Sequence, residues 1–210
     1  MEMNGMASSL HDESQQMSLR ERKKRLAQAT IEEAALRLFQ QQGYEHTSVQ
    51  DIAEVVMMSP RTFFRYFASK EEVLFGPMHA ALSDGLRFLQ HAAPTESPHA
   101  ALRATFECLA SQYQQQRASF LLRYQVAVQT PSIASVYLYA LMETEPAICE
   151  ALCSRLESVP NRHEIRFLVA IYMTALRVAL EVWLEQEAQG DLVSLLREYL
   201  DDFSSLSHHA

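Results

Sequence analysis

Closely spaced helix-start signals in residues 18–72 constrain the fold of this chain more than any other feature. Ser18-Leu19-Arg20-Glu21 has the form of a capping box, in which a hydroxyl and an acidic side chain satisfy two N–H groups at a helix start. Thr47-Ser48-Val49-Gln50 and Ser69-Lys70-Glu71-Glu72 have the same form, and Ser59-Pro60 pairs a hydroxyl cap with a proline at the first helical position. These signals predict helices over about 18–42, 48–56 and 60–66, and a fourth helix that begins after Ser69.

The rest of the chain also has helical periodicity. Ser97-Pro98 and Thr130-Pro131 are start signals, Val159-Pro160 and Gly190 are breaks, and Pro146 is expected to kink the helix that contains it. Apolar residues recur at helical spacing in two last helices, over about 161–188 and 191–205. We therefore predict an all-α fold with a disordered tail over 1–17, a small N-terminal domain over 18–80 and a larger helical domain over 81–210.

The charge is distributed unevenly along the chain. The net charge of −8 argues against a nucleic-acid partner, but residues 18–76 carry nine basic and eight acidic side chains, whereas residues 77–210 carry nine and fifteen. All three lysines lie in the first of these segments. A basic face on one small region with an acidic remainder is typical of a nucleic-acid module joined to another domain.

Several classes of protein are disfavoured by composition. The five glycines are scattered, so no glycine-rich loop can hold a nucleotide phosphate, and we predict no cofactor. No signal peptide is recognisable, and the uncharged stretch 124–142 contains Pro131, so we predict a cytoplasmic protein without a membrane partner. Cys149 and Cys153 lie four residues apart near His163, but without a second ligand pair we expect free buried thiols and no metal site.

Two short helices joined by a tight turn, over 48–56 and 60–66, form a helix-turn-helix motif within residues 48–67. The second helix is narrow enough to enter the major groove of DNA, where its N-terminal side chains reach the edges of the bases. The first helix crosses behind it, and its N-terminal N–H groups can face a phosphate. The motif therefore predicts double-stranded DNA as a partner.

Roughly residues 20–80 resemble the TetR family of bacterial transcriptional regulators. The resemblance is carried by Ile31-x-x-Ala34-Ala35-x-x-Leu38-Phe39, Gly43-Tyr44-x-x-Thr47-Ser48-Val49-x-Asp51-Ile52-Ala53, and Ser59-Pro60-Arg61-Thr62-Phe63-Phe64-Arg65-Tyr66-Phe67-x-Ser69-Lys70-Glu71. It implies an all-α homodimer whose N-terminal domain binds a palindromic operator, usually as a repressor, and whose C-terminal domain binds a small effector that releases the DNA. The turn between the short helices usually carries glycine in this family, but here it reads Val56-Met57-Met58-Ser59.

The faces of the two short helices suggest which residues contact DNA. Phe63 and Phe67 are four apart and are expected to face inward. Hydroxyls at the helix starts either only cap the helix or also touch a phosphate, and both alternatives stay open. The predicted base contacts are Arg61, Thr62, Phe64 and Arg65, and the predicted contacts to the phosphate backbone are Arg22, Lys23, Thr47, Ser48, Ser59, Tyr66 and Lys70.

Basic residues crowd the first turns of the first helix, at Arg20, Arg22, Lys23, Lys24 and Arg25. A positive charge there opposes the helix macrodipole, at a cost of ~0.3–1 kcal/mol per residue. A DNA backbone nearby would turn that cost into attraction, although a solvated basic face is about as good an explanation for any single residue.

The C-terminal half is rich in aromatic residues and methionine. Taken singly these residues are expected in the core, but together they can line an apolar cavity for a mainly hydrophobic or aromatic effector. The candidate ligand-binding residues are Phe106, Tyr113, Phe120, Tyr124, Tyr137, Met142, Phe167 and Met173. Residues 161–205 are expected to form the homodimer interface through their broad apolar stripes, unless these stripes pack only within one chain.

Two other functions remain open alternatives. One is a helical small-molecule-binding or protein-interaction module that has lost specific DNA binding, for which the Met57-Met58 turn is a candidate cause. The other is an all-helical enzyme, but the sequence shows no Ser-His-acid, His-Glu-x-x-His or paired-carboxylate signature, and we predict no catalytic residues.

Overall fold

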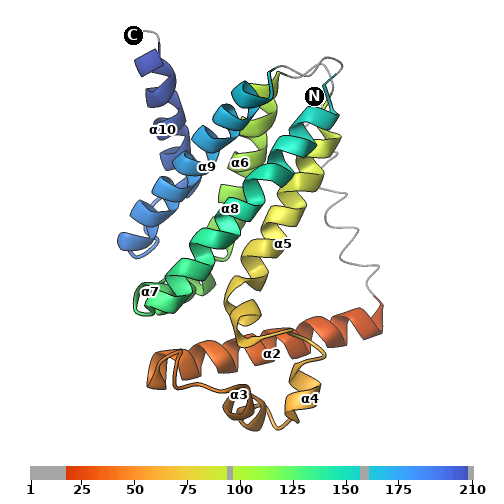
Figure 1. Ribbon diagram of the computed structural model, residues 1–210. Helices are drawn as coiled ribbons and strands as arrows, with labels where there is room; N and C mark the ends of the chain where they lie inside the picture. The colour runs from red at the N-terminus through yellow and green to blue at the C-terminus, as the bar shows by residue number, and fades with distance from the viewer. Residues whose placement is uncertain (1–17, 94–96, 157–160, 208–210) are drawn as a thin grey trace, which may run out of the picture. The chain divides into compact units, whose positions relative to one another are not determined.

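The computed structural model describes residues 18–93, 97–156 and 161–207, without the side chains at 128, 134, 136–142 and 204–207. These residues form helices α2 to α10, and no strand occurs among them (Figure 1). The expected all-α fold is confirmed. The predicted disordered tail over 1–17 lies outside the described residues.

The chain divides into two compact units, the first ending at Leu74 and the second beginning at Phe75. This boundary precedes the predicted one at residue 80. It falls inside one continuous helix, α5 (Lys70–His91), which supplies its first turn to the first unit and its remainder to the second. A boundary inside a helix leaves no loop or linker composition from which sequence could locate it.

The first unit is built around α2 (Leu19–Gln42), whose start and end are as predicted. The Glu21 N–H donates to the Ser18 hydroxyl at 3.2 Å, and the Ser18 N–H donates to the Glu21 carboxylate at 2.9 Å. These hydrogen bonds hold the pKa of Glu21 below its usual value. At the other end, Gly43 adopts a φ of 85°, which costs glycine little, and its N–H donates to the Phe39 carbonyl at 3.0 Å.

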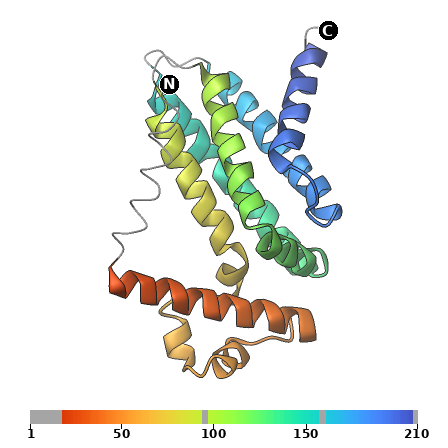
Figure 2. The ribbon, with the colours of Figure 1, turned by 180° about the vertical axis from the view of Figure 1, so that it is seen from behind.

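Helices α3 (Val49–Val55) and α4 (Pro60–Phe63) complete the helix-turn-helix (Figures 1 and 2). Helix α3 packs against both α2 and α4. Both views show α4 beside the N-terminal half of α2. The shared core is apolar and almost fully buried, and it includes Ile31, Ala35, Phe39, Ile52, Ala53, Phe63 and Phe67.

Two sequence predictions about these helices need correction. The capping box of α3 is formed by Ser48 and Asp51, one residue later than the predicted Thr47–Gln50 box. Helix α4 ends at Phe63 and not near Tyr66, because the next residues tighten into a turn: the Tyr66 N–H donates to the Phe63 carbonyl at 2.8 Å. The recognition element is therefore one short helical turn followed by a compact bend.

The turn between α3 and α4 does contain a residue in the left-handed region. Met57 has a φ of 52°, and its side chain is 93% exposed. Its N–H donates to the Glu54 carbonyl at 3.0 Å, and the Met58 N–H donates to the Ala53 carbonyl at 2.9 Å. This hydrogen-bond pattern is a Schellman motif, which here ends α3 without the glycine that usually occupies the position.

The second unit is a helical bundle made from α5, α6 (Pro98–Gln115), α7 (Arg117–Val128), α8 (Pro131–Ser154), α9 (Arg162–Glu185) and α10 (Leu192–Ser207). Helix α9 packs against α6, α8 and α10, as Figures 1 and 2 show. Its Trp183 is buried and satisfies the indole N–H by donating to the Gly190 carbonyl at 3.3 Å. The start of α6 after Ser97 and the break at Pro131 are as predicted. The predicted break at Val159-Pro160 lies outside the described residues.

Candidate nucleic-acid interface and effector cavity

Helix α4 turns an apolar side inward and a basic side outward. Phe63 and Phe67 are buried with ring centroids 5.8 Å apart, which confirms the predicted inward pair. Arg61, Phe64 and Arg65 are exposed, and the Phe64 ring remains 54% accessible. The structure thus leaves two guanidinium groups and one aromatic ring available for the edges of bases.

Ser59 and Thr62 form the N-terminal end of α4. The Thr62 N–H donates to the Ser59 hydroxyl at 3.1 Å, and the two hydroxyl oxygens lie 2.9 Å apart. Ser59 is exposed and Thr62 is half-buried. Capping therefore occupies the Ser59 hydroxyl without removing it from the surface.

Arg65 and Tyr66 form a pair at the end of the recognition element. The Arg65 guanidinium lies 5.1 Å from the centroid of the Tyr66 ring, and its Nη2 donates to the Tyr66 hydroxyl oxygen at 3.2 Å. The ring attracts the guanidinium electrostatically, and the group stays charged, so the pair presents a cationic group together with a hydroxyl.

The start of α3 carries both a hydroxyl and a carboxylate. The Asp51 N–H donates to the Ser48 hydroxyl at 3.1 Å, and the Ser48 N–H donates to the Asp51 carboxylate at 2.7 Å. This backbone hydrogen bond is the main reason that the pKa of Asp51 lies below its usual value. Ser48 remains exposed, so its hydroxyl is accessible to a phosphate.

Thr47 does not belong to the accessible surface, which corrects its prediction as a phosphate contact. Its side chain is only 1% exposed, and its hydroxyl donates to the Gly43 carbonyl at 2.8 Å. This hydrogen bond stabilises the loop between α2 and α3 on its buried side. Local pattern could not separate Thr47 from Ser48, because both are hydroxyl residues at a plausible cap and only tertiary burial distinguishes them.

Lys70 is also turned toward the protein. Its ammonium group donates to the carbonyls of Tyr44 at 2.9 Å and Thr47 at 3.1 Å, and it lies 4.0 Å from the centroid of the Tyr44 ring. An ammonium group has three N–H donors, so one remains for a phosphate. Lys70 therefore mainly holds the loop between α2 and α3, and the predicted phosphate contact would use only its remaining donor.

Tyr44 and Glu71 complete this arrangement and were not singled out from the sequence. The Tyr44 hydroxyl donates to the Glu71 carboxylate. Burial and this hydrogen bond raise the pKa of Tyr44 far above its usual range. Burial alone would raise the pKa of Glu71, but hydrogen bonds from Tyr44 and Ser69 outweigh it and the pKa is lowered. We call Tyr44, Lys70 and Glu71 the loop lock.

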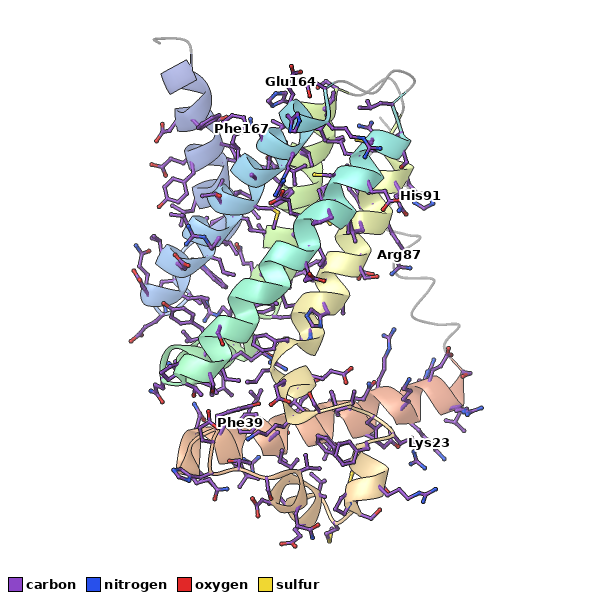
Figure 3. All side chains as sticks on the ribbon, viewed as in Figure 1. Lys23, Phe39, Arg87, His91, Glu164 and Phe167 are labelled. Atoms are coloured by element: carbon purple, nitrogen blue, oxygen red, sulfur yellow. The ribbon has the colours of Figure 1, made fainter. Side chains whose placement is uncertain are left out.

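The first turns of α2 carry a run of exposed cations. Arg22 and Lys23, predicted as backbone contacts, are both exposed, and Figure 3 shows Lys23 projecting from this half of the helix. Both views show α4 beside the same half of α2, so the two elements that carry these cations are neighbours in the first unit. Their exposed basic residues are Arg20, Arg22, Lys23, Lys24, Arg25, Arg61 and Arg65.

The second unit contains a mainly apolar cavity of about 60 Å³ between α5, α6, α8 and α9. Three predicted ligand-binding residues line it, Phe106, Tyr113 and Met173. Its other lining residues, which sequence reasoning missed, are Met78, His79, Leu82, Leu109, Thr144, Ile148, Leu176, Arg177 and Leu180. Aliphatic residues at helical spacing give no sign that distinguishes a cavity wall from an ordinary core.

The other predicted ligand-binding residues lie elsewhere. Phe120 is buried against the Tyr113 ring at a centroid distance of 4.5 Å, and Tyr124 is half-buried. Tyr137 and Met142 lie on α8, but their side chains are outside the described part of the chain. Phe167 is 68% exposed on α9, so its prediction as a cavity residue is wrong. It belongs to the opposite side of its helix from the core (Figure 3).

Helix α9 has two apolar faces. One is buried in the core of the second unit and includes Ile165, Val169, Tyr172, Leu176 and Trp183. The opposite face is formed by Phe167, which is exposed, and by Ile171, Val178 and Val182, which are half-buried, at spacings of one helical turn and its multiples. Among the described helices, α9 is the one long and apolar enough to cross a membrane by length and composition. It packs against α6, α7, α8 and α10 of the second unit.

A short helical rod with an outward basic face, supported by a buried aromatic pair and followed by a separate helical unit with a cavity, defines a helix-turn-helix transcriptional regulator. Comparison with known proteins identifies the family. The family model described as bacterial regulatory proteins, tetR family, matches residues 31–75, and a model described as the MftR C-terminal domain matches residues 96–206. The chain belongs to the TetR family, and it is a helix-turn-helix regulator of transcription, as the sequence resemblance implied.

Individual relatives extend this similarity over most of the chain. The regulator TcmR of Streptomyces glaucescens is 34% identical over 173 residues, which cover 79% of this chain and 76% of TcmR. The putative mycofactocin biosynthesis regulator MftR of Mycobacterium tuberculosis is 30% identical over 112 residues, covering 52% of this chain and 57% of MftR. A crystal structure of a TerR/AcrR-family regulator from Aquifex aeolicus, 17% identical, has the same fold with a TM-score of 0.54 and covers 85% of this chain and 98% of its own.

Proposed function

We propose that this protein is a cytoplasmic repressor that binds a palindromic DNA operator as a homodimer and is released by a mainly apolar effector. The observation that carries the DNA-binding part is the orientation of α4, which buries Phe63 and Phe67 and exposes Arg61, Phe64 and Arg65. Exposed arginine and phenylalanine side chains at the N-terminal end of such a helix are available to the edges of bases in the major groove.

Base recognition is assigned to the outward residues of α4. Arg61 and Arg65 can each make bidentate contacts with a guanine, and the Phe64 ring can touch a thymine methyl group. Thr62 stands at the accessible N-terminal end of the same element. These contacts select sequence, whereas the basic residues of α2 contact phosphates and fix the position of the protein.

The phosphate contacts are assigned to the accessible members of the predicted set. Arg22 and Lys23 extend from α2, and Ser48, Ser59 and Tyr66 offer hydroxyl groups beside helix starts and turns. Lys70 can add its one remaining donor from within the loop lock. Thr47 is left out because its hydroxyl is buried.

The homodimer is assigned to residues 161–205, with the outer face of α9 at its centre. A helix that is apolar on opposite sides must bury both to be stable in water, and the core covers only one. A second copy related by a two-fold axis would cover the face made by Phe167, Ile171, Val178 and Val182. A palindromic operator has two half-sites and therefore requires two copies of α4, which a homodimer supplies.

The effector is assigned to the cavity between α5, α6, α8 and α9. Its walls are apolar except for a few polar groups, among them His79, Thr144 and Arg177. A volume of about 60 Å³ holds about two water molecules, so an effector must widen the cavity. Met78 and Met173 line it, and unbranched methionine side chains repack easily.

Selection of duplexes from a randomised DNA library by the full-length protein tests the DNA-binding part. We expect the selection to recover a palindrome. Arg61→Ala should weaken the free energy of operator binding by ~1–3 kcal/mol and relax the base preference at one base pair of each half-site. Lys23→Ala should weaken binding to every duplex, and it should reduce the slope of log K against log salt concentration by about one.

Arg37→Ala is a matched control, because Arg37 is an exposed α2 arginine paired with Glu33 at 2.8 Å and lies outside the proposed contacts. It should leave operator affinity unchanged. Recovery of no preferred sequence, or equal losses for Arg61→Ala and Arg37→Ala, would contradict the proposal and favour a helical module without specific DNA binding.

A further inference from the structure

A groove of about 660 Å³ lies between the C-terminal half of α8 and the first turns of α9. Cys149 and Cys153 both line it. Both are free cysteines, as expected from the sequence, but they are half-buried, whereas the sequence suggested that they are fully buried. Their spacing of four residues places them one turn apart on the same face of α8.

The spacing of the two thiols suits one bridging ion. Side chains four apart on a helix have Cβ atoms ~5–6 Å apart. Two metal–sulfur bonds of ~2.3 Å placed end to end span ~4.6 Å, so a linear ion can join the two Sγ atoms through ordinary side-chain rotations. A disulfide needs Cβ atoms only ~3.5–4.5 Å apart, so bridging the sulfurs directly would distort α8.

The donor set selects the kind of ion. A structural zinc ion takes four ligands, and within the described residues no group of three or more His, Cys, Asp or Glu side chains is arranged to hold a metal. His163, which lies near the cysteines in sequence, is exposed and is not among the groove-lining residues. Two thiolates alone satisfy soft cations that accept linear coordination, such as Cu(I) and its chemical analogue Ag(I).

Binding of the ion in the groove requires both thiols to lose a proton. Binding of one monovalent ion displaces a proton from each thiol, so two neutral thiols and M⁺ give a complex of charge −1 and two released protons. Arg162 and Arg166 line the α9 side of the groove, and Arg166 is hydrogen-bonded to Glu145. Glu145 and Glu150 line the groove as well, and burial together with Glu145 raises the pKa of the Cys149 thiol above its usual value, so the bound ion must itself displace the protons.

We propose that Cys149 and Cys153 form a two-coordinate site for a soft monovalent cation in this groove, separate from the effector cavity. No residue lines both the groove and the cavity. The site needs neither DNA nor a second copy of the chain, so it can be tested whether or not the proposed regulatory function is correct.

Titration of the full-length protein with silver nitrate in chloride-free buffer, against a competing monothiol, tests the proposal. We expect one Ag(I) per chain by native mass spectrometry and two sulfur neighbours by X-ray absorption. Cys149→Ser and Cys153→Ser should each weaken binding by ~10²–10⁴-fold, because the second sulfur acts at high effective concentration. Cys108→Ser is the matched control and should bind as the wild type does.

A second measurement uses only the wild-type chain and therefore does not depend on how the variants fold. Bound Ag(I) should protect Cys149 and Cys153 from alkylation but leave Cys108 reactive, as read by mass spectrometry of the peptides. Equal protection of all three cysteines, equal affinities for all three serine variants, or zinc retained as tightly as silver would overturn the proposal.

Discussion

The ammonium group of Lys70 lies 4.0 Å from the centroid of the Tyr44 ring and donates to the Tyr44 carbonyl at 2.9 Å. One lysine thereby joins the first turn of α5 to the loop that precedes α3. Since α3 packs against α4, the position of the recognition element depends on this contact as well as on the apolar core.

Lys70→Ala should therefore destabilise the protein even without DNA. It removes two hydrogen bonds from a charged group, each of which contributes ~1.5–3 kcal/mol, so we expect a loss of at least ~1.5 kcal/mol in the free energy of unfolding by urea. Lys24→Ala, at an exposed position on α2, is the control and should change stability by less than ~0.5 kcal/mol. Unchanged stability combined with weaker DNA binding would instead assign Lys70 to phosphate contact alone.

Tyr44→Phe should raise the pKa of Glu71, which an NMR titration of its side chain can follow. Because the folded pKa of Glu71 is lowered, its contribution to stability is present above the pKa of the unfolded chain and is lost as the pH falls through the folded pKa. The variant should consequently be less stable than the wild type by ~1 kcal/mol near pH 7, and the difference should shrink in acid. A difference that is constant between pH 7 and pH 3 would disagree with this explanation.

Met57→Gly should stabilise the protein. Met57 adopts a positive φ with its side chain almost fully in solvent, so glycine relieves strain of ~1–2 kcal/mol and removes no packing. The greater entropy of glycine in the unfolded chain offsets part of this, leaving a net gain of up to ~1 kcal/mol in urea unfolding. Met57→Ala keeps the strain and should show no such gain, and equal effects of the two substitutions would refute the strain argument.

Phe167→Asp should weaken the homodimer. It places a charge in the outer apolar face of α9, and removal of an anchoring aromatic side chain commonly costs ~2–4 kcal/mol, or roughly 30- to 1,000-fold in Kd. Sedimentation velocity over a range of concentrations measures the shift toward monomer. Phe88→Asp is a control at another exposed phenylalanine of the second unit and should leave the dimer intact. Identical behaviour of the two variants would place the interface elsewhere.

Local chemistry made most of the helix starts predictable. The hydroxyls of Ser18, Ser59 and Ser97 all accept the N–H groups expected of them, because a cap is decided within four residues of chain. At Thr47 and Ser48 the same reasoning misplaced the cap by one residue. There the decision came from burial of Thr47 beneath the loop, which depends on residues distant in sequence.

Helical periodicity in α9 marks the face that contains Ile165, Tyr172 and Trp183, and this face is buried within the chain. Phe167 was assigned to the cavity because aromatic residues are frequent in this half of the chain, but it lies in the outer face. The cavity wall draws on four helices, and members such as Met78, Ile148 and Leu180 meet only when the bundle is assembled. The sequence of a single helix therefore cannot predict which of its residues line the cavity.

Helix α5 carries both Lys70 of the loop lock and Met78 of the cavity wall, with Gly76 and Pro77 between them. Pro77 has no N–H to donate to the preceding turn, so this is the most compliant place in an otherwise stiff rod. Lys70 lies before these two residues and Met78 after them, so the loop lock and the cavity wall are joined through the part of α5 that lacks this backbone hydrogen bond. The local stiffness of α5 at Gly76 and Pro77 therefore determines how strongly a displacement of Met78 affects Lys70.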